Sequence, residues 1–216
     1  MSMFRNRVDA GRRLADLLLA SADIGGGGVV VLGLPRGGVP IAAEIGRALG
    51  APLDIIVVRK LGLPSQPELA MGAIGEDGVY VENEEVMATA ALCAFDIEAM
   101  VRRERVELTR RAERYRDGRP RLDLRGHCAV IVDDGIATGS TARAACRVAR
   151  AHGASRIVLA VPVAPEAAVL ALHDVCDHML CVANPEPFYA VGEWYDDFFP
   201  TSDFEVVELL RASAQP

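Results

Sequence analysis

Short apolar runs alternate along the chain with segments of helical periodicity, and this alternation limits the fold more than any other feature. The expected strands are apolar almost throughout and cover residues 29–34, 54–58, 129–132, 156–161 and 178–182. The expected helices cover residues 9–20, 41–49, 83–116, 140–152 and 165–172, with a last helix that begins near Ser202 or Asp203. Apolar strands joined by helices belong to parallel sheets that are covered on both faces. The sequence therefore predicts an α/β fold in which helices cover both faces of a parallel twisted sheet.

Three unusual stretches follow strands of this expected sheet. PRGG follows the first strand, residues 59–78 follow the second, and DDGIATGST follows the strand at 129–132. Residues 59–78 are long for a connection, and we expect them to form a mobile or functional loop. Ligands of parallel sheets bind beyond the carboxyl ends of the strands. The three stretches therefore predict one site at that edge.

The composition excludes several classes of protein. Of the 216 residues, 51% are hydrophobic and 25% are charged, which is typical of a globular chain. The apolar runs are too short to span a membrane, and the charged N-terminus lacks the apolar segment of a secretory signal. The net charge of −7 argues against nonspecific nucleic-acid binding as the main role.

The five cysteines include no CxxC pair, which argues against a zinc site or a disulfide framework. We expect these side chains to be small buried hydrophobes and the protein to be cytoplasmic.

The basic residues are almost all arginine. Lys60 is the only lysine among 23 basic side chains, and either chance or a need for a compact point charge explains it. Seven arginines lie within residues 102–116 and alternate with glutamates. This spacing favours a solvated helix face with i,i+3 and i,i+4 ion pairs over a polyanion site.

The stretch AVIVDDGIATGST, residues 129–141, lacks the residues of three common phosphate or acidic sites. No lysine precedes Ser140 and Thr141, as a P-loop requires, and no GxGxxG follows a strand. A receiver domain needs a further aspartate and a lysine on later strands, and the strand at 156–161 offers no aspartate. A strand, two acids and a small-residue turn at the start of a helix remain.

That arrangement suits a phosphorylated sugar. Backbone N–H groups and hydroxyls at the start of a helix favour a phosphate, and here they come from Ala137, Thr138, Gly139, Ser140 and Thr141. Just before this turn, Asp133 and Asp134 can accept hydrogen bonds from vicinal sugar hydroxyls or bind a hydrated Mg²⁺.

The stretch VIVDDGIATGST resembles the phosphoribosyl-pyrophosphate motif of the type I phosphoribosyltransferase family. Within that family the chain is most similar to a group of phosphoribosyltransferases with unassigned acceptors, through PRGG, VRK…PELAxGAI and FYAVGxWYxDF. The resemblance implies a single domain over residues 1–216, with a core at about 27–182 and a hood formed by 1–24 and 183–216. It also implies a 5′-phosphate cradle at 137–141, ribose hydroxyls on Asp133 and Asp134, and a pyrophosphate loop at 35–38.

The implied reaction is a Mg²⁺-dependent transfer of ribose 5-phosphate from phosphoribosyl pyrophosphate to a nitrogen base or amine, with release of pyrophosphate. Mg²⁺ on Asp133 and Asp134, together with Arg36, Lys60 and the amides of Gly37 and Gly38, is expected to stabilise the polyanionic leaving group. Closure of the long loop is expected to exclude water.

The acceptor is less well defined by the sequence. Purine-salvage enzymes of the hypoxanthine–guanine kind carry an aspartate where this chain has Ala137, so the general acid or base must come from elsewhere. Glu68 is a candidate, whereas Glu76 fits a solvated loop carboxylate better. Three aromatic residues either stack on a planar base or form a small core under the hood: Phe188, Trp194 and Tyr195.

Two other functions fit the same motif. One is a non-catalytic regulator that binds phosphoribosyl pyrophosphate or a nucleotide and acts on a partner. The other is a hydrolase of phosphorylated sugars. Apart from the sugar donor and its nitrogenous acceptor, we expect no nucleic acid or membrane partner. The resemblance also suggests a homodimer.

Overall fold

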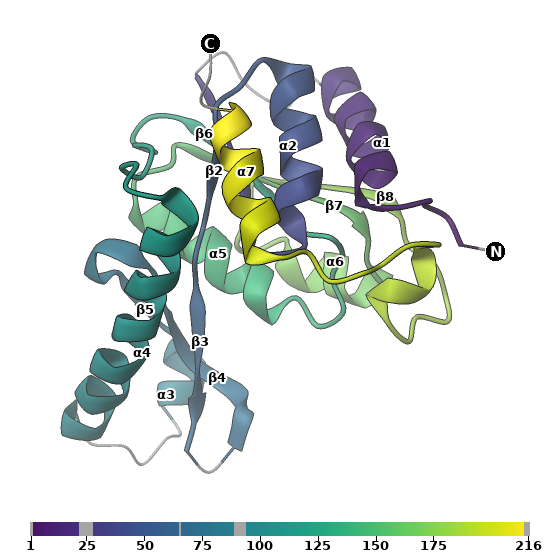
Figure 1. Ribbon diagram of the computed structural model, residues 1–216. Helices are drawn as coiled ribbons and strands as arrows, with labels where there is room; N and C mark the ends of the chain where they lie inside the picture. Colours follow the sequence, from purple (N-terminus) through teal and green to yellow (C-terminus); the bar gives the residue numbers. More distant parts are fainter. Residues whose placement is uncertain (1, 22–27, 65, 89–93, 214–216) are drawn as a thin grey trace.

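The computed structural model describes residues 2–21, 28–64, 66–88 and 94–213, and Figure 1 shows the arrangement of their helices and strands. The strands are β1 (Val29–Gly33), β2 (Leu53–Ile55), β3 (Arg59–Leu63), β4 (Gln66–Ile74), β5 (Tyr80–Glu82), β6 (Cys128–Val132), β7 (Arg156–Val163) and β8 (His178–Ala183). The α-helices are α1 (Arg7–Ala20), α2 (Gly38–Leu49), α3 (Glu84–Met87), α4 (Ala94–Arg116), α5 (Ser140–Ala151), α6 (Glu166–Leu172) and α7 (Asp203–Ser213).

The central sheet has five parallel strands in the order β2-β1-β6-β7-β8. Gly33, at the end of β1, pairs with Ile55 of β2 and with Val132 of β6. The carboxyl ends of three neighbouring strands therefore meet at one level, as the predicted α/β fold requires. The expected strand at 54–58 is shorter in the structure, because β2 ends at Ile55.

Helices cover both faces of this sheet, and alternate strand residues face opposite cores. Val31 and Val130 pack in one core with residues of α1, α2 and α7, such as Leu14, Ile41 and Leu210. The neighbouring strand positions pack in a second core with α5 and α6. This burial explains the continuous apolar strands of the sequence.

The expectation that residues 59–78 form a loop is wrong. Most of these residues form β3 and β4, which pair with β5 in an antiparallel three-stranded sheet. Leu61, Met71 and Ile74 are buried, so this sheet has an apolar face of its own. It packs against α4 and α5 and extends away from the central sheet (Figure 1).

The expected helix at 83–116 is divided in the structure into α3 and α4, and residues 89–93 between them lie outside the described chain. Asn83 lies directly before α3, but its side chain makes no hydrogen bond to the start of that helix. Its Nδ2 donates a hydrogen bond to the Ala70 carbonyl instead. At α7, the Ser202 hydroxyl accepts a hydrogen bond from the Glu205 N–H, so Ser202 is the N-cap.

The arginines of α4 form the expected surface pairs only in part. Arg102 pairs with Glu98, and both Arg110 and Arg111 pair with Glu107. Arg59 of β3 pairs with Glu104 and so ties the small sheet to this helix.

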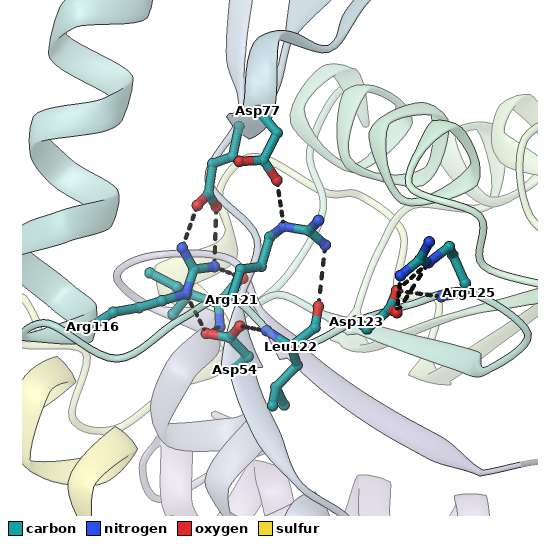
Figure 2. A network of polar contacts seen from close by, with 9 residues as sticks. Asp54, Asp77, Arg116, Arg121, Leu122, Asp123 and Arg125 are labelled. Carbon is teal, nitrogen blue, oxygen red and sulfur yellow. Dashed lines mark hydrogen bonds and ion pairs between the residues drawn. The ribbon is translucent and has the colours of Figure 1, made fainter.

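Arg116, at the end of α4, is buried and is the centre of a polar network (Figure 2). Its guanidinium group donates to Asp54 Oδ1 at 2.8 Å and to the Ile55 carbonyl at 3.0 Å, and it also pairs with Glu76. The second oxygen of Asp54 accepts the Leu122 N–H at 3.0 Å. The network therefore joins α4, β2, the turn after β4 and the chain before β6, and it compensates each buried charge.

The N-terminal segment packs against the aromatic stretch before α7. The Phe4 N–H donates to the Trp194 carbonyl at 2.9 Å, and the Phe4 carbonyl accepts the Asp196 N–H at 2.8 Å. The N-terminal segment therefore lies beside the aromatic stretch before α7.

Cys128, Cys146 and Cys176 are buried free thiols, as predicted, and Cys181 is half-buried. Cys93 lies outside the described residues. Within the described chain, no helix is both long enough and apolar enough to cross a membrane.

Asp54→Ala removes one of the two carboxylates that compensate Arg116. We expect the free energy of unfolding, measured by urea denaturation, to fall by about 3 kcal/mol. Asp123→Ala is the matched control, because it removes a carboxylate from the exposed Asp123–Arg125 pair in the same region (Figure 2), and it should cost far less. Equal losses in the two variants would contradict a structural role for the buried network.

Candidate functional site

The loops after β1 and β6 are in direct contact at the carboxyl edge of the central sheet. The Leu34 N–H donates to the Val132 carbonyl at 2.8 Å, at the point where both strands end. The Pro35–Arg36 peptide bond that follows is cis. PRGG and the acidic pair are therefore neighbours in space, although about a hundred residues separate them.

Gly37 and Gly38 allow this contact. A Cβ atom on Gly37 would overlap Oδ2 of Asp134 and lie 2.5 Å from its Cγ, and one on Gly38 would overlap the Val132 carbonyl. Side chains of any size at these positions would force the two loops apart. The glycines thus serve packing between the loops, in addition to the ligand approach that the sequence predicts.

Asp133 and Asp134 are held differently. Asp133 Oδ1 accepts the Asp134 N–H at 2.9 Å. Asp134 Oδ2 accepts two hydrogen bonds from the Arg7 guanidinium, at 2.7 and 2.9 Å. The same guanidinium lies 4.0 Å from the centre of the Phe198 ring and donates to the Phe199 carbonyl. One of the two carboxylates therefore has a cation from α1 as its direct partner.

The acidic pair resists ionisation. Burial raises the pKa of Asp133 well above its ordinary value, and the negative charge of Asp134 raises it further. Burial also raises the pKa of Asp134, while the hydrogen bonds from Arg7 oppose that rise. A ligand that brings hydroxyl donors or positive charge to Asp133 would relieve this cost.

Sequence reasoning missed Arg7. It lies 127 positions from Asp134 and belongs to no motif. The sequence could have indicated only that a buried acidic pair needs a cation nearby. An arginine in the N-terminal segment was one possible source of that cation.

Of the two alternatives predicted for Tyr195, the structure supports the small aromatic core. It is buried between Phe4 and Phe198, at ring-centre distances of 5.3 and 4.9 Å, and its hydroxyl donates to the Asp134 carbonyl at 2.6 Å. Its ring is thus covered on both sides and does not offer a face to a base. Its contacts instead support the backbone of the acidic pair.

Phe188 and Trp194 lie together in the same C-terminal stretch. Their rings stack with centres 6.2 Å apart and planes inclined by 21°, and both side chains are half-buried. Stacked, half-buried rings are compatible with both interpretations of the sequence, a platform for a planar acceptor and a small apolar core.

Residues 137–141 form the turn that begins α5. Ala137, Thr138 and Thr141 are exposed, and the Thr138 and Ser140 hydroxyl oxygens lie 3.3 Å apart. The Arg143 N–H is bonded to the Gly139 carbonyl, so the N–H groups of Ser140, Thr141 and Ala142 belong to the first turn, where helices lack internal acceptors. The predicted phosphate cradle has the required exposure and donors.

A pocket of about 460 Å³ lies beside PRGG. Arg36 and Thr141 contribute to its lining, as do the chain after β2 and three arginines of α4: Arg110, Arg111 and Arg114. These arginines were predicted to form a solvated face only, so their position is a second feature that sequence reasoning missed.

The remaining predicted catalytic residues lie on the small antiparallel sheet and its turn. Lys60 is on β3, opposite Ala73 of β4, and it is not one of the described residues that line this pocket. Glu68 belongs to β4, and its side chain lies outside the described part of the structure. Glu76 is not a solvated loop carboxylate, because it pairs with buried Arg116.

The residues at the acidic pair fit Mg²⁺. They offer hard oxygen donors, and the raised pKa of Asp133 indicates a carboxylate whose charge is incompletely compensated. The described residues contain no group of three His, Cys, Asp or Glu side chains that could hold a metal. Mg²⁺ commonly takes one or two protein carboxylates and completes its shell with water and phosphate oxygens.

Comparisons with known proteins agree on one family. The phosphoribosyl transferase domain family matches residues 4–189. A Mycobacterium tuberculosis protein, provisionally named a phosphoribosyl transferase, is 56% identical over 210 residues in each of two strains. The match covers 97% of this chain and 47% of that protein, so the chain spans about half the length of these curated relatives.

Two solved structures have the same fold. TT1426 from Thermus thermophilus is 41% identical, with a TM-score of 0.89 over 98% of this chain and 99% of that one. AQ2163 from Aquifex aeolicus is 11% identical, with a TM-score of 0.51 over 95% of this chain and 85% of that one, which supports the fold alone.

Asp133→Asn should increase stability at neutral pH. Because its pKa is raised, Asp133 binds its proton more tightly in the folded state than in the unfolded state. The wild-type chain therefore loses stability as the pH rises from the ordinary carboxyl pKa of 3.8 through the raised pKa of the folded state. Asparagine does not titrate, so the gain should be largest near neutral pH and disappear at about pH 3. Unfolding midpoints measured across this range test the sign.

Asp123→Asn is the control of opposite sign. Its exposed pairing with Arg125 lowers the pKa of Asp123 to about 2, so its charge supports the fold above the ordinary value and this support is lost as the pH falls. A stability gain at neutral pH from both variants would contradict the burial account of Asp133.

Tyr195→Phe should lower the free energy of unfolding by about 1 kcal/mol, because it removes the hydrogen bond to the Asp134 carbonyl and leaves the ring packing intact. Tyr189→Phe is the control, since that ring is 76% exposed. Unchanged stability in Tyr195→Phe would argue against the supporting role.

Proposed function

Because the chain belongs to the phosphoribosyl transferase domain family, we propose that it transfers ribose 5-phosphate from phosphoribosyl pyrophosphate to a nitrogen base or amine. One observation carries the proposal. PRGG lies directly against Asp134, and a helix-start turn with free donors follows within one loop. Groups suited to pyrophosphate, ribose hydroxyls and a terminal phosphate thus lie in the order that the donor needs.

Each part of the donor has proposed partners. The 5′-phosphate binds the turn formed by Ala137, Thr138, Gly139, Ser140 and Thr141. The ribose 2′- and 3′-hydroxyls donate to Asp133 and Asp134, which offsets part of the cost of burying their negative charge. Arg36 and the Gly37 N–H bind the pyrophosphate. The Gly38 N–H, predicted for the same role, already donates to the Leu34 carbonyl at 3.0 Å.

In the proposed reaction, the acceptor nitrogen forms a bond to C1 of the ribose as the C1–O bond to pyrophosphate breaks. The leaving oxygen keeps the electron pair, and the nitrogen loses a proton. Arg36 stabilises the negative charge that develops on the pyrophosphate. Lys60, predicted for the same role, lies on β3 outside the described lining of the pocket beside PRGG and is given no part in this step. Mg²⁺, held by Asp133 and Asp134, would add positive charge near those oxygens.

Fewer residues are proposed to contact the acceptor than the donor. Ala137 offers no carboxylate for a purine, and Glu76 is committed to Arg116, so Glu68 remains the proposed acid or base. Phe188 and Trp194 are proposed to stack on a planar acceptor. Tyr195 is assigned a positioning role through Asp134.

Pyrophosphate release from phosphoribosyl pyrophosphate, Mg²⁺ and a panel of nucleobases and amines tests the proposal. We expect turnover with at least one acceptor. Turnover with none, together with tight binding of phosphoribosyl pyrophosphate, would favour a regulator. Release of inorganic phosphate instead of pyrophosphate would indicate a hydrolase.

The double variant Asp133→Asn/Asp134→Asn should bind phosphoribosyl pyrophosphate about 100-fold more weakly in calorimetry, since two charged hydrogen-bond acceptors are lost. The matched control is Asp196→Asn/Asp197→Asn, another adjacent pair that is exposed and removes the same charge. Unchanged affinity in the first variant, with the fold intact by circular dichroism, would overturn the assignment of the acidic pair.

A further inference from the structure

The pocket beside PRGG is strongly cationic on the side that belongs to α4. Four guanidinium groups line it, from Arg36 and from Arg110, Arg111 and Arg114, whereas Asp203 is the one carboxylate among the described lining residues. The three helix arginines are each about half exposed, so their charged ends reach solvent. A cavity with this excess of positive charge attracts a small polyanion.

Asp203, the first residue of α7, already occupies an anion position in this pocket. One of its oxygens lies 2.9 Å from Arg114 Nη1, and the other accepts the Tyr115 hydroxyl at 3.0 Å. Arg36 of the PRGG loop lies 3.5 Å from the same carboxylate. Asp203 therefore bridges the loop after β1 and the arginines of α4.

We propose that Arg111 and Arg114 bind the outer phosphate of the donor's pyrophosphate, which displaces Asp203 from Arg36 and Arg114. The proposal rests on the proposed function and extends the pyrophosphate site from PRGG to α4. Arginine suits this role because its planar fork binds phosphate oxygens in pairs. The pocket also reaches Thr141 of the phosphate cradle, so it is continuous with the site of the rest of the donor.

Displacement of Asp203 has a consequence for specificity. Pyrophosphate carries more negative charge than the Asp203 carboxylate and can contact Arg36 and α4 together, so it can displace that carboxylate. The site should therefore discriminate pyrophosphate and the full donor from ribose 5-phosphate, which has no group to place there.

Calorimetric titration of the whole chain with inorganic pyrophosphate and Mg²⁺ tests the proposal. Arg111→Gln and Arg114→Gln should each weaken binding about tenfold. Arg102→Gln, on the same helix but paired with Glu98 and not among the lining residues, should bind as the wild type does. Asp203→Asn should bind several-fold more tightly, because the competing carboxylate is lost.

Wild-type affinity in both Arg111→Gln and Arg114→Gln would overturn the arginine site, and unchanged or weaker binding in Asp203→Asn would overturn the displacement. Among the described residues, Arg111 is paired with Glu107 of its own helix, so Arg111→Gln keeps the test valid if Arg114→Gln fails to fold. Ribose 5-phosphate is the second probe, and its affinity should not change in either arginine variant.

The proposed function can fail separately. If pyrophosphate binding depends on Arg111 and Arg114 but no acceptor supports turnover, the anion site stands and the transferase reaction does not. If turnover occurs at wild-type rate and donor affinity in both variants, the reaction stands and the α4 site is wrong.

Discussion

The contact between Gly37 of the PRGG loop and Asp134 of the acidic pair determines how the site is built. It requires β1 and β6 to end at the same level, a glycine where any side chain would overlap the carboxylate, and a cation for the carboxylate that is buried there. Arg7 supplies that cation from α1, and Tyr195 supports the adjacent carbonyl from the C-terminal stretch. Helix α1 and the stretch before α7 thus both contact the acidic pair, and burial still disfavours the charged form of Asp133, a cost that hydroxyl donors or a metal would reduce.

Most of the central sheet could be predicted because its strands are buried on both faces and carry a continuous apolar signal. The edge at which we expect ligands to bind followed from that topology. Residues 59–78 were interpreted as a loop because glycines and prolines interrupt the strand pattern there. In the structure, pairing between β3, β4 and β5, with packing against α4 and α5, overrides those local signals.

The site was predictable where its residues are contiguous in sequence and only there. DDGIATGST and PRGG are local motifs with a physical meaning, whereas the Arg7–Asp134 pair depends on the packing of two chain ends. The arginines of α4 show the same limit. Their spacing with glutamates correctly indicated surface pairs, but which of them turn toward the pocket depends on how α4 docks beside β2 and α7.

We propose that the loops after β1 and β6 hold one sugar donor between them. Hydrogen–deuterium exchange of the whole chain, with and without phosphoribosyl pyrophosphate and Mg²⁺, tests it most directly because it reads the backbone donors themselves. We expect slower exchange at both residues 36–39 and residues 138–142 when the donor is added. Slower exchange in only one of the two loops, or in neither while the donor is bound, would contradict it.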